Sequence, residues 1–104
     1  MKYKVRTVRG KRPYVQVDFE DEKYNLVGEM LLAERGLLNE LIRSLDSVLD
    51  GGEESGSFAG NAFSVSITRE TANITNDING EEAQAPSKEL RKLTKVYQKQ
   101  YVKL

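Results

Sequence analysis

The stretch GLLNELIRSLDSVLD, residues 36 to 50, decides the fold, because its apolar residues recur at the spacing of one helical face. With an advance of roughly 100° per residue, these side chains fall within an arc of about 140°. They are Leu37, Leu38, Leu41, Ile42, Leu45, Val48 and Leu49. We therefore expect an amphipathic helix that buries one face against a sheet. Gly51 and Gly52 are expected to end it, since glycine tolerates the left-handed backbone common at helix C-termini.

Residues before this helix alternate between apolar and polar side chains, as in half-buried strands. Residues 2 to 9 form the first predicted strand, and the second runs from Pro13 to about Glu20. We expect a third strand from Tyr24 to Glu29, leading into the helix.

Residues after the helix predict a hairpin and a second helix. Residues 51 to 60 are expected to form an acidic, glycine-rich loop anchored by Phe58. The alternation around Val65 predicts a strand that pairs with residues 71 to 76, and residues 77 to 86 are expected to form a loop. The last helix places one set of residues on its packed side and lysines opposite. The packed set is Leu90, Leu93, Tyr97, Tyr101 and Leu104.

These elements predict an α+β fold in the order β-β-β-α-β-β-α. One antiparallel sheet of about five strands would carry the amphipathic helix on its face, with the C-terminal helix docked beside it. A chain of 104 residues, 38% of them hydrophobic, is expected to form a single domain over residues 1 to 104.

Charge is balanced overall but segregated along the chain. Residues 1 to 12 carry a net charge of +6 and residues 88 to 104 a net charge of +5. Between them, residues 13 to 54 carry −8 and residues 55 to 87 carry −3. A formal net charge of zero argues against a general nucleic-acid binder, because such domains are usually strongly basic.

The chain contains no cysteine and no histidine, so thiolate chemistry and the commonest general base are excluded. We therefore expect no enzymatic activity, no cofactor and no metal site. No run of about 20 apolar residues occurs, so we expect no membrane association and a cytoplasmic location.

Two charged surfaces remain as candidates. The basic ends, together with their tyrosines, could bind a nucleic-acid backbone or mediate homodimerisation. However, the helical spacing assigns Tyr97 and Tyr101 to the core, and a row of lysines on a terminal helix is usually a solubilising face. The acidic run from Asp18 to Glu22 is read as a solvated turn, because no spaced ligands for a cation accompany it.

The order of elements resembles the small bacterial immunity proteins that accompany contact-dependent growth-inhibition toxins, and is similar in layout to the YacL-type proteins of enterobacteria. The resemblance covers roughly residues 13 to 104 and includes the helix ending VLDGGEES and the segment FAGNAFSVSITRETANITND. Its signature positions are Gly60, Asn61, Phe63, Val65, Ile67, Arg69, Glu70 and Ile74. The basic first strand departs from the acidic N-termini of such proteins.

The resemblance implies a protein that binds and neutralises one cognate toxin domain, typically a nuclease, in the cytoplasm. A nuclease presents positive potential to phosphates, so clustered carboxylates would steer an inhibitor towards it. The carboxylates predicted to bind the partner are Glu20, Asp21, Glu22, Glu53, Glu54, Asp77, Glu81 and Glu82. The alternative is a small nucleic-acid-binding or homo-oligomeric accessory module that uses the basic termini.

Overall fold

The computed structural model describes residues 1–104 as an α+β fold with two antiparallel sheets and three α-helices. In chain order the elements are β1 (Tyr3–Val8), β2 (Tyr14–Phe19), the 3-10 helix η1 (Glu22–Tyr24), α1 (Asn25–Ala33), the 3-10 helix η2 (Arg35–Leu37), α2 (Leu38–Leu49), β3 (Ser55–Ala59), β4 (Phe63–Thr68), β5 (Thr71–Asn76), β6 (Glu82–Pro86) and α3 (Ser87–Tyr101). The predicted α+β class is confirmed, whereas the single five-stranded sheet and the predicted element order are wrong.

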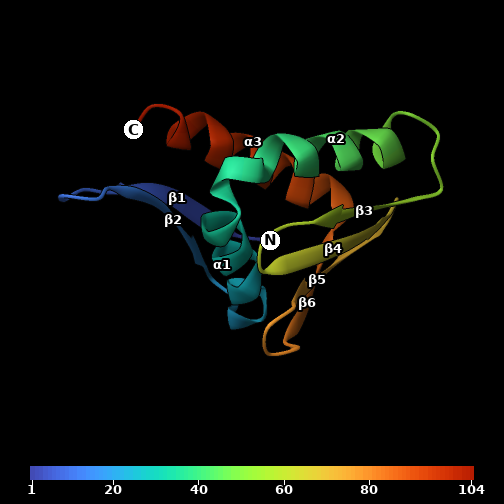
Figure 1. Cartoon of the computed structure of the whole chain (residues 1–104), viewed down its shortest axis with the longest axis horizontal. Coiled ribbons are helices and arrows are strands. Elements are labelled where there is room, and N and C mark those ends of the chain that lie inside the picture. The colour runs from blue at the N-terminus through green and yellow to red at the C-terminus, as the bar shows by residue number, and fades with distance from the viewer.

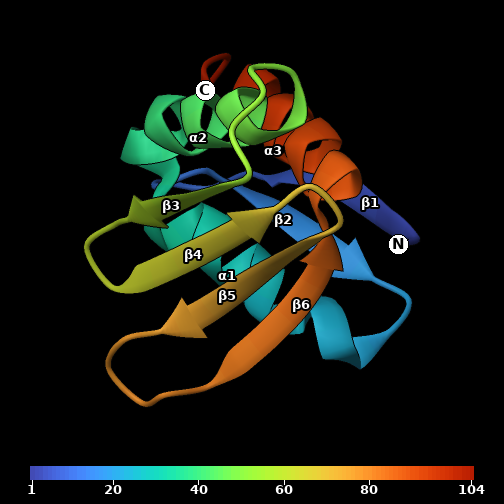
Figure 2. The same ribbon diagram turned by 90° about the vertical axis from the view of Figure 1, so that its right-hand side faces the viewer.

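The two sheets are held together by the helices. β1 and β2 form a two-stranded ribbon, and the other four strands form a sheet in the order β3-β4-β5-β6. In Figure 1 the ribbon and the sheet diverge like the arms of a V, with α1 between them and α2 and α3 across the top. Figure 2 shows α2 and α3 above the four strands. One cluster of 21 buried residues includes side chains from both sheets, so they share a single hydrophobic core.

The segment from Tyr24 to Glu29 is helical, and the third strand predicted there is wrong. The buried side chains recur at i, i+1, i+4 and i+5, which is the spacing of a helix face. They are Leu26, Val27, Met30 and Leu31. Gly28 lies where α1 crosses the ribbon, and a Cβ there would come within 3.3 Å of the Phe19 ring. This helix separates the ribbon from the sheet.

Two more strands occupy segments that were predicted to be loops. β3 lies within residues 51 to 60, and β6 lies within residues 77 to 86. Both are edge strands with few large side chains in the core: Phe58 in β3, and Ala83 and Ala85 in β6. Main-chain pairing to β4 and β5 therefore determines these strands more than their own side-chain pattern does.

The amphipathic helix predicted over residues 36 to 50 is present as α2. Leu38, Leu41, Leu45 and Val48 are buried, and the other three apolar residues of the stripe are half-buried. The chain leaves the helix through Gly52, whose φ of +83° is in the left-handed region expected for a glycine that ends a helix.

The C-terminal helix α3 docks as expected over most of its length. Leu90, Leu93 and Tyr97 are buried and Tyr101 is half-buried. Leu104 is exposed, contrary to the prediction, because α3 ends at Tyr101.

One charged side chain is completely buried. Glu34, between α1 and η2, accepts hydrogen bonds from the backbone N–H groups of Asn61, Ala62 and Phe63 at 2.7, 2.8 and 2.9 Å. The β3–β4 turn therefore forms a nest of donors around one carboxylate. A Cβ on Gly60 would lie 2.3 Å from Glu34 Cδ, so only glycine leaves room for the carboxylate. Gly60 and two of the three donors, Asn61 and Phe63, are signature positions, and this part of the signature is thereby assigned a structural role.

Candidate functional site

The eight carboxylates predicted to bind a partner are exposed and lie in three places. Glu20, Asp21 and Glu22 follow β2 into η1; Glu53 and Glu54 lie in the α2–β3 loop; Asp77 and Glu81 lie in the β5–β6 turn, and Glu82 begins β6. Glu22 lies in the 3-10 helix η1 and Glu82 in β6, whereas the other six lie in loops or turns.

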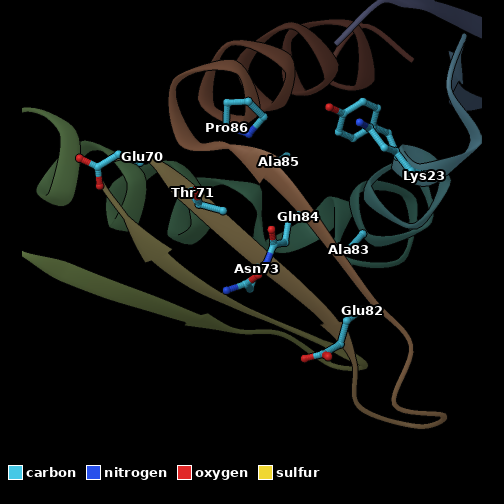
Figure 3. A pocket seen from close by; sticks show the side chains of 10 residues that line it. Lys23, Glu70, Thr71, Asn73, Glu82, Ala83, Gln84, Ala85 and Pro86 are labelled. Carbon is cyan, nitrogen blue, oxygen red and sulfur yellow. The ribbon is translucent and has the colours of Figure 1, made fainter.

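Two adjoining hollows connect the first of these places with the third. One, of about 610 Å³, lies along β6 between η1 and the exposed side chains of β5, and Glu70 and Glu82 are among its lining residues. The other, of about 730 Å³, is lined by the turn from Glu20 to Glu22. Lys23 and Tyr24 line both hollows, so the two adjoin at these residues, and we call them together the β6 groove. Figure 3 shows Glu70 and Glu82 far apart along β6, with Gln84 between them.

The β6 groove brings together only part of the predicted set. It contains the turn from Glu20 to Glu22 together with Glu82, and Asp77 and Glu81 lie in the turn at its end. Glu53 and Glu54 precede β3, at the opposite edge of the sheet from β6. Because β4 and β5 lie between these two strands, β3 and β6 are about 14 Å apart at ordinary strand spacing. Glu70, a signature position of the resemblance, was not among the carboxylates predicted to bind a partner.

Five carboxylates and two lysines line the β6 groove, so its net charge is negative. One lysine, Lys23, is held by its own neighbours: its Nζ lies 3.8 Å from Asp21 and 5.1 Å from the centre of the Tyr24 ring. Asp21 also accepts a hydrogen bond from the Lys23 backbone N–H at 3.0 Å and thereby caps η1. The other lysine, Lys2, lies opposite Glu20 in the ribbon, where the backbone N–H of Glu20 bonds to the Lys2 carbonyl.

The β5–β6 turn presents an apolar side chain beside this acidic surface. Ile78 is 83% exposed at the tip of the turn. Asn76 Oδ1 accepts from the Ile78 N–H at 2.9 Å, and Asn79 Oδ1 accepts from the Glu81 N–H at 2.9 Å. The Asp77 N–H also bonds to the Ala62 carbonyl, and Ser64 Oγ donates to Asp77 Oδ2, so Ile78 is displayed on a locally ordered loop.

Several other carboxylates are engaged in ion pairs within the fold. Asp18 accepts from Arg6 across the ribbon. Asp46 of α2 and Asp50, the residue that follows α2, both accept from Arg91 of α3, and the hydrogen bond that Arg91 donates to Asp50 is the main cause that raises the pKa of the Arg91 guanidinium. These ion pairs connect elements of the fold, and they leave Asp18, Asp46 and Asp50 less available to bind a partner.

The basic ends of the chain meet at one end of the molecule. The β1–β2 turn carries the exposed side chains of Arg9, Lys11 and Arg12. Gln100 Nε2 donates to Thr7 Oγ1 at 2.9 Å, so the C-terminal end of α3 lies against the ribbon just before this turn. Figure 1 shows the turn and the C-terminus at the same end of the long axis.

No group of three or more carboxylate, histidine or cysteine side chains is placed to hold a metal ion. None of the helices combines the length and the apolar character needed to cross a membrane. No family model matches the chain, and neither a curated protein nor a solved structure matches it.

Proposed function

We propose that this chain is an immunity-type protein that binds a cognate toxin domain, typically a nuclease, in the cytoplasm and blocks its active site. The observation that carries the proposal is the β6 groove, where carboxylates from the β2–η1 turn, from Glu70 and from Glu82 line one concave surface. A cationic substrate cleft is the complementary surface, and opposite potentials accelerate the encounter of two proteins.

Ile78 supports the same surface. Tight protein interfaces concentrate binding energy in a few central side chains surrounded by polar residues. An isoleucine that is 83% exposed, with Asp77 before it and Glu81 after it, has this arrangement. In the proposed complex Ile78 enters an apolar pocket beside the cationic cleft of the toxin domain.

Two charge-reversal variants, one triple and one double, test the surface. The first variant carries Glu22→Lys, Glu70→Lys and Glu82→Lys, and none of these three side-chain carboxylates accepts a hydrogen bond from a backbone N–H. The matched control carries Glu53→Lys and Glu54→Lys, which change charge on an acidic loop outside the β6 groove. Each is measured against the toxin domain encoded by the adjacent gene, by inhibition of toxin activity and by association rate at several salt concentrations.

We expect the groove variant to associate at least about tenfold more slowly at low salt and to inhibit poorly, while the control inhibits like the parent. If both variants inhibit equally well, the β6 groove is not the binding surface. If the parent chain itself does not bind the adjacent toxin domain, the immunity role is wrong.

A second candidate function is binding to a nucleic-acid backbone at the basic end. The hydrogen bond between Gln100 and Thr7 favours it, because it places the basic β1–β2 turn beside Lys99 and Lys103 of the C-terminal segment. Titration of labelled RNA or DNA at about 150 mM salt tests it: a dissociation constant below about 1 μM that weakens steeply with salt would favour this function. Arg9→Ala with Lys11→Ala would then reduce both affinity and salt dependence.

A further inference from the structure

The outer edge of β6 presents main-chain groups that no strand pairs with. The Asn76 N–H bonds to the Glu81 carbonyl at 2.8 Å, and the Ser87 N–H bonds to the Glu70 carbonyl at 3.1 Å. Because bonded residues alternate in an antiparallel ladder, Ala83 and Ala85 also face β5, and the backbone groups of Glu82 and Gln84 point away from it. No hydrogen bond from outside the sheet reaches either of those two residues.

Other sheet edges are covered by side chains or by charge. At β3, Ser44 Oγ of α2 donates to the Ser57 carbonyl at 2.9 Å. At β2, the Tyr97 hydroxyl of α3 donates to the Val15 carbonyl at 2.8 Å. The β1 edge alternates with exposed lysine and arginine, which discourage strand pairing. At β6 the groove opens beside the strand, with η1 next to it, and no side chain or strand bonds to the outward main-chain groups of Glu82 and Gln84.

We infer that the β6 edge accepts an extended, basic segment of the partner as an additional antiparallel or parallel strand. This inference rests on the proposed function and specifies how the partner is held. Glu82 and Gln84 each supply one N–H and one carbonyl, whereas Pro86 supplies only a carbonyl. Main-chain bonds of this kind give affinity, while side-chain pockets on either side give specificity.

Charge selects a basic segment over a second copy of this chain. A segment lying on the edge passes Glu82 and faces the turn from Glu20 to Glu22. Alternating lysine or arginine side chains would meet these carboxylates. Pairing β6 with the β6 of another copy would instead bring two acidic grooves together, and like charges across an interface are unfavourable.

The test compares Gln84→Pro with Gln84→Thr in the full chain. Proline removes the outward N–H of residue 84 without removing a bond to β5, and threonine keeps the N–H while changing the side chain. The probe is a peptide of about six residues that alternates lysine with threonine. Its controls are the same peptide N-methylated at alternate residues and a glutamate–threonine peptide. Binding is followed by the amide NMR signals of the labelled protein up to about 1 mM peptide.

We expect the lysine peptide to shift the Glu82 and Gln84 amide signals saturably and to give cross-strand contacts to residue 84. Gln84→Pro and N-methylation should each weaken binding at least about tenfold, and Gln84→Thr should change it little. Equal binding of the N-methylated peptide would overturn strand addition, as would the absence of any shift at these amides. Shifts that appear with protein concentration alone would assign the edge to a second copy and overturn the inference.

The peptide result is separable from the proposed function. If the peptide pairs with β6 but the chain does not inhibit the adjacent toxin domain, strand addition stands and the immunity role fails. If the chain inhibits that domain and Gln84→Pro inhibits equally well, the role stands and the edge is not used.

Discussion

The two edges of the four-stranded sheet are strands of five residues each, yet their surroundings differ. β3 is fastened to the helices: Glu34 holds the turn that follows it, and Ser44 bonds to its outer carbonyl. β6 follows a turn that is held by its own asparagine side chains and by bonds between Asp77 and the β3–β4 hairpin, and the outer main chain of β6 faces the acidic groove. A helix thus bonds to the outer main chain of one edge strand and not to that of the other, which is the difference expected if β6 serves recognition.

Removing the buried carboxylate of Glu34 should destabilise the β3 edge more than any other single change. Glu34→Ala leaves three backbone N–H groups without acceptors, each costing about 1 to 3 kcal/mol, so we expect a loss of about 4 kcal/mol or more in unfolding free energy. Gly60→Ala should approach this loss by displacing the same carboxylate. Urea denaturation of both single variants and the double variant measures it.

The double variant provides the control. If the cost of Gly60→Ala arises from its clash with Glu34, that cost should largely disappear when residue 34 is already alanine. Additive losses would contradict the clash. Asn76→Ala in the β5–β6 turn should cost less than about 1 kcal/mol, because water can replace its exposed bonds.

Truncating the helix that covers β3 should have the next largest effect. Leu41 is fully buried on α2, and Leu41→Ala should cost about 3 kcal/mol through lost burial and a cavity. Ile42→Ala, one residue along and half-buried, should cost clearly less. A loss below about 0.5 kcal/mol for Leu41→Ala in a denaturant melt would mean that this side of the sheet is not anchored by α2.

Tyr97 covers the ribbon edge as Ser44 covers β3, and its removal should show a pH signature. Tyr97→Phe leaves the Val15 carbonyl without its hydrogen-bond donor and should lower the unfolding free energy by about 1 to 2 kcal/mol at neutral pH. Burial raises the pKa of Tyr97 from 10.0 to about 12. The unfolded chain therefore loses this proton first, so the stabilisation is complete below pH 10 and declines as pH rises towards 12.

Thermal melts between pH 9 and 12 test this signature. The parent should lose stability faster than Tyr97→Phe over that range, so the two should converge. Tyr14→Phe, at an exposed position, is the control and should follow the parent. Parallel pH curves for the parent and Tyr97→Phe would contradict the effect of burial.

The smallest expected changes in stability come from single substitutions at the two edge strands, β3 and β6. Ser44→Ala removes one exposed bond to the Ser57 carbonyl and should cost about 0.5 to 1 kcal/mol. Gln84→Ala removes no hydrogen bond and should change stability by less than about 0.5 kcal/mol. Urea melts resolve the difference, and an equal loss for both would mean that Ser44 contributes nothing to holding β3.

The local pattern of apolar and polar residues was sufficient to predict α2, β4 and β5, because buried side chains recur in them at the regular spacing of a helix or a strand. It failed at residues 24 to 29, where Tyr24, Leu26 and Gly28 resemble a strand although Val27 and Met30 complete a helix face. It also failed for β3 and β6, whose place depends on strands distant in sequence. Small side chains such as Ala83 carry little local signal for a strand.

The sequence could predict which carboxylates of the candidate site are exposed, but not which of them lie together. Exposure of Glu82 and Glu22 follows from their polar surroundings, but their common groove depends on η1 packing beside β6. Glu34 could have been suspected, since it lies three residues after Leu31 and four after Met30 on the buried side of α1. Its partners lie 27 to 29 residues later and leave no signal near it.

The donor nest around Glu34 has a further consequence for chemical complementation. Truncation to alanine keeps Cβ and removes a CH₂–COO⁻ unit, which has nearly the composition of acetate. The Asn61, Ala62 and Phe63 N–H groups would then surround an anion-shaped vacancy. Acetate should bind there and raise the melting temperature of Glu34→Ala in a concentration-dependent manner, by mass action on the folded state. The parent, whose nest is already filled, should not respond, so this single substitution would convert a structural turn into an acetate-responsive one.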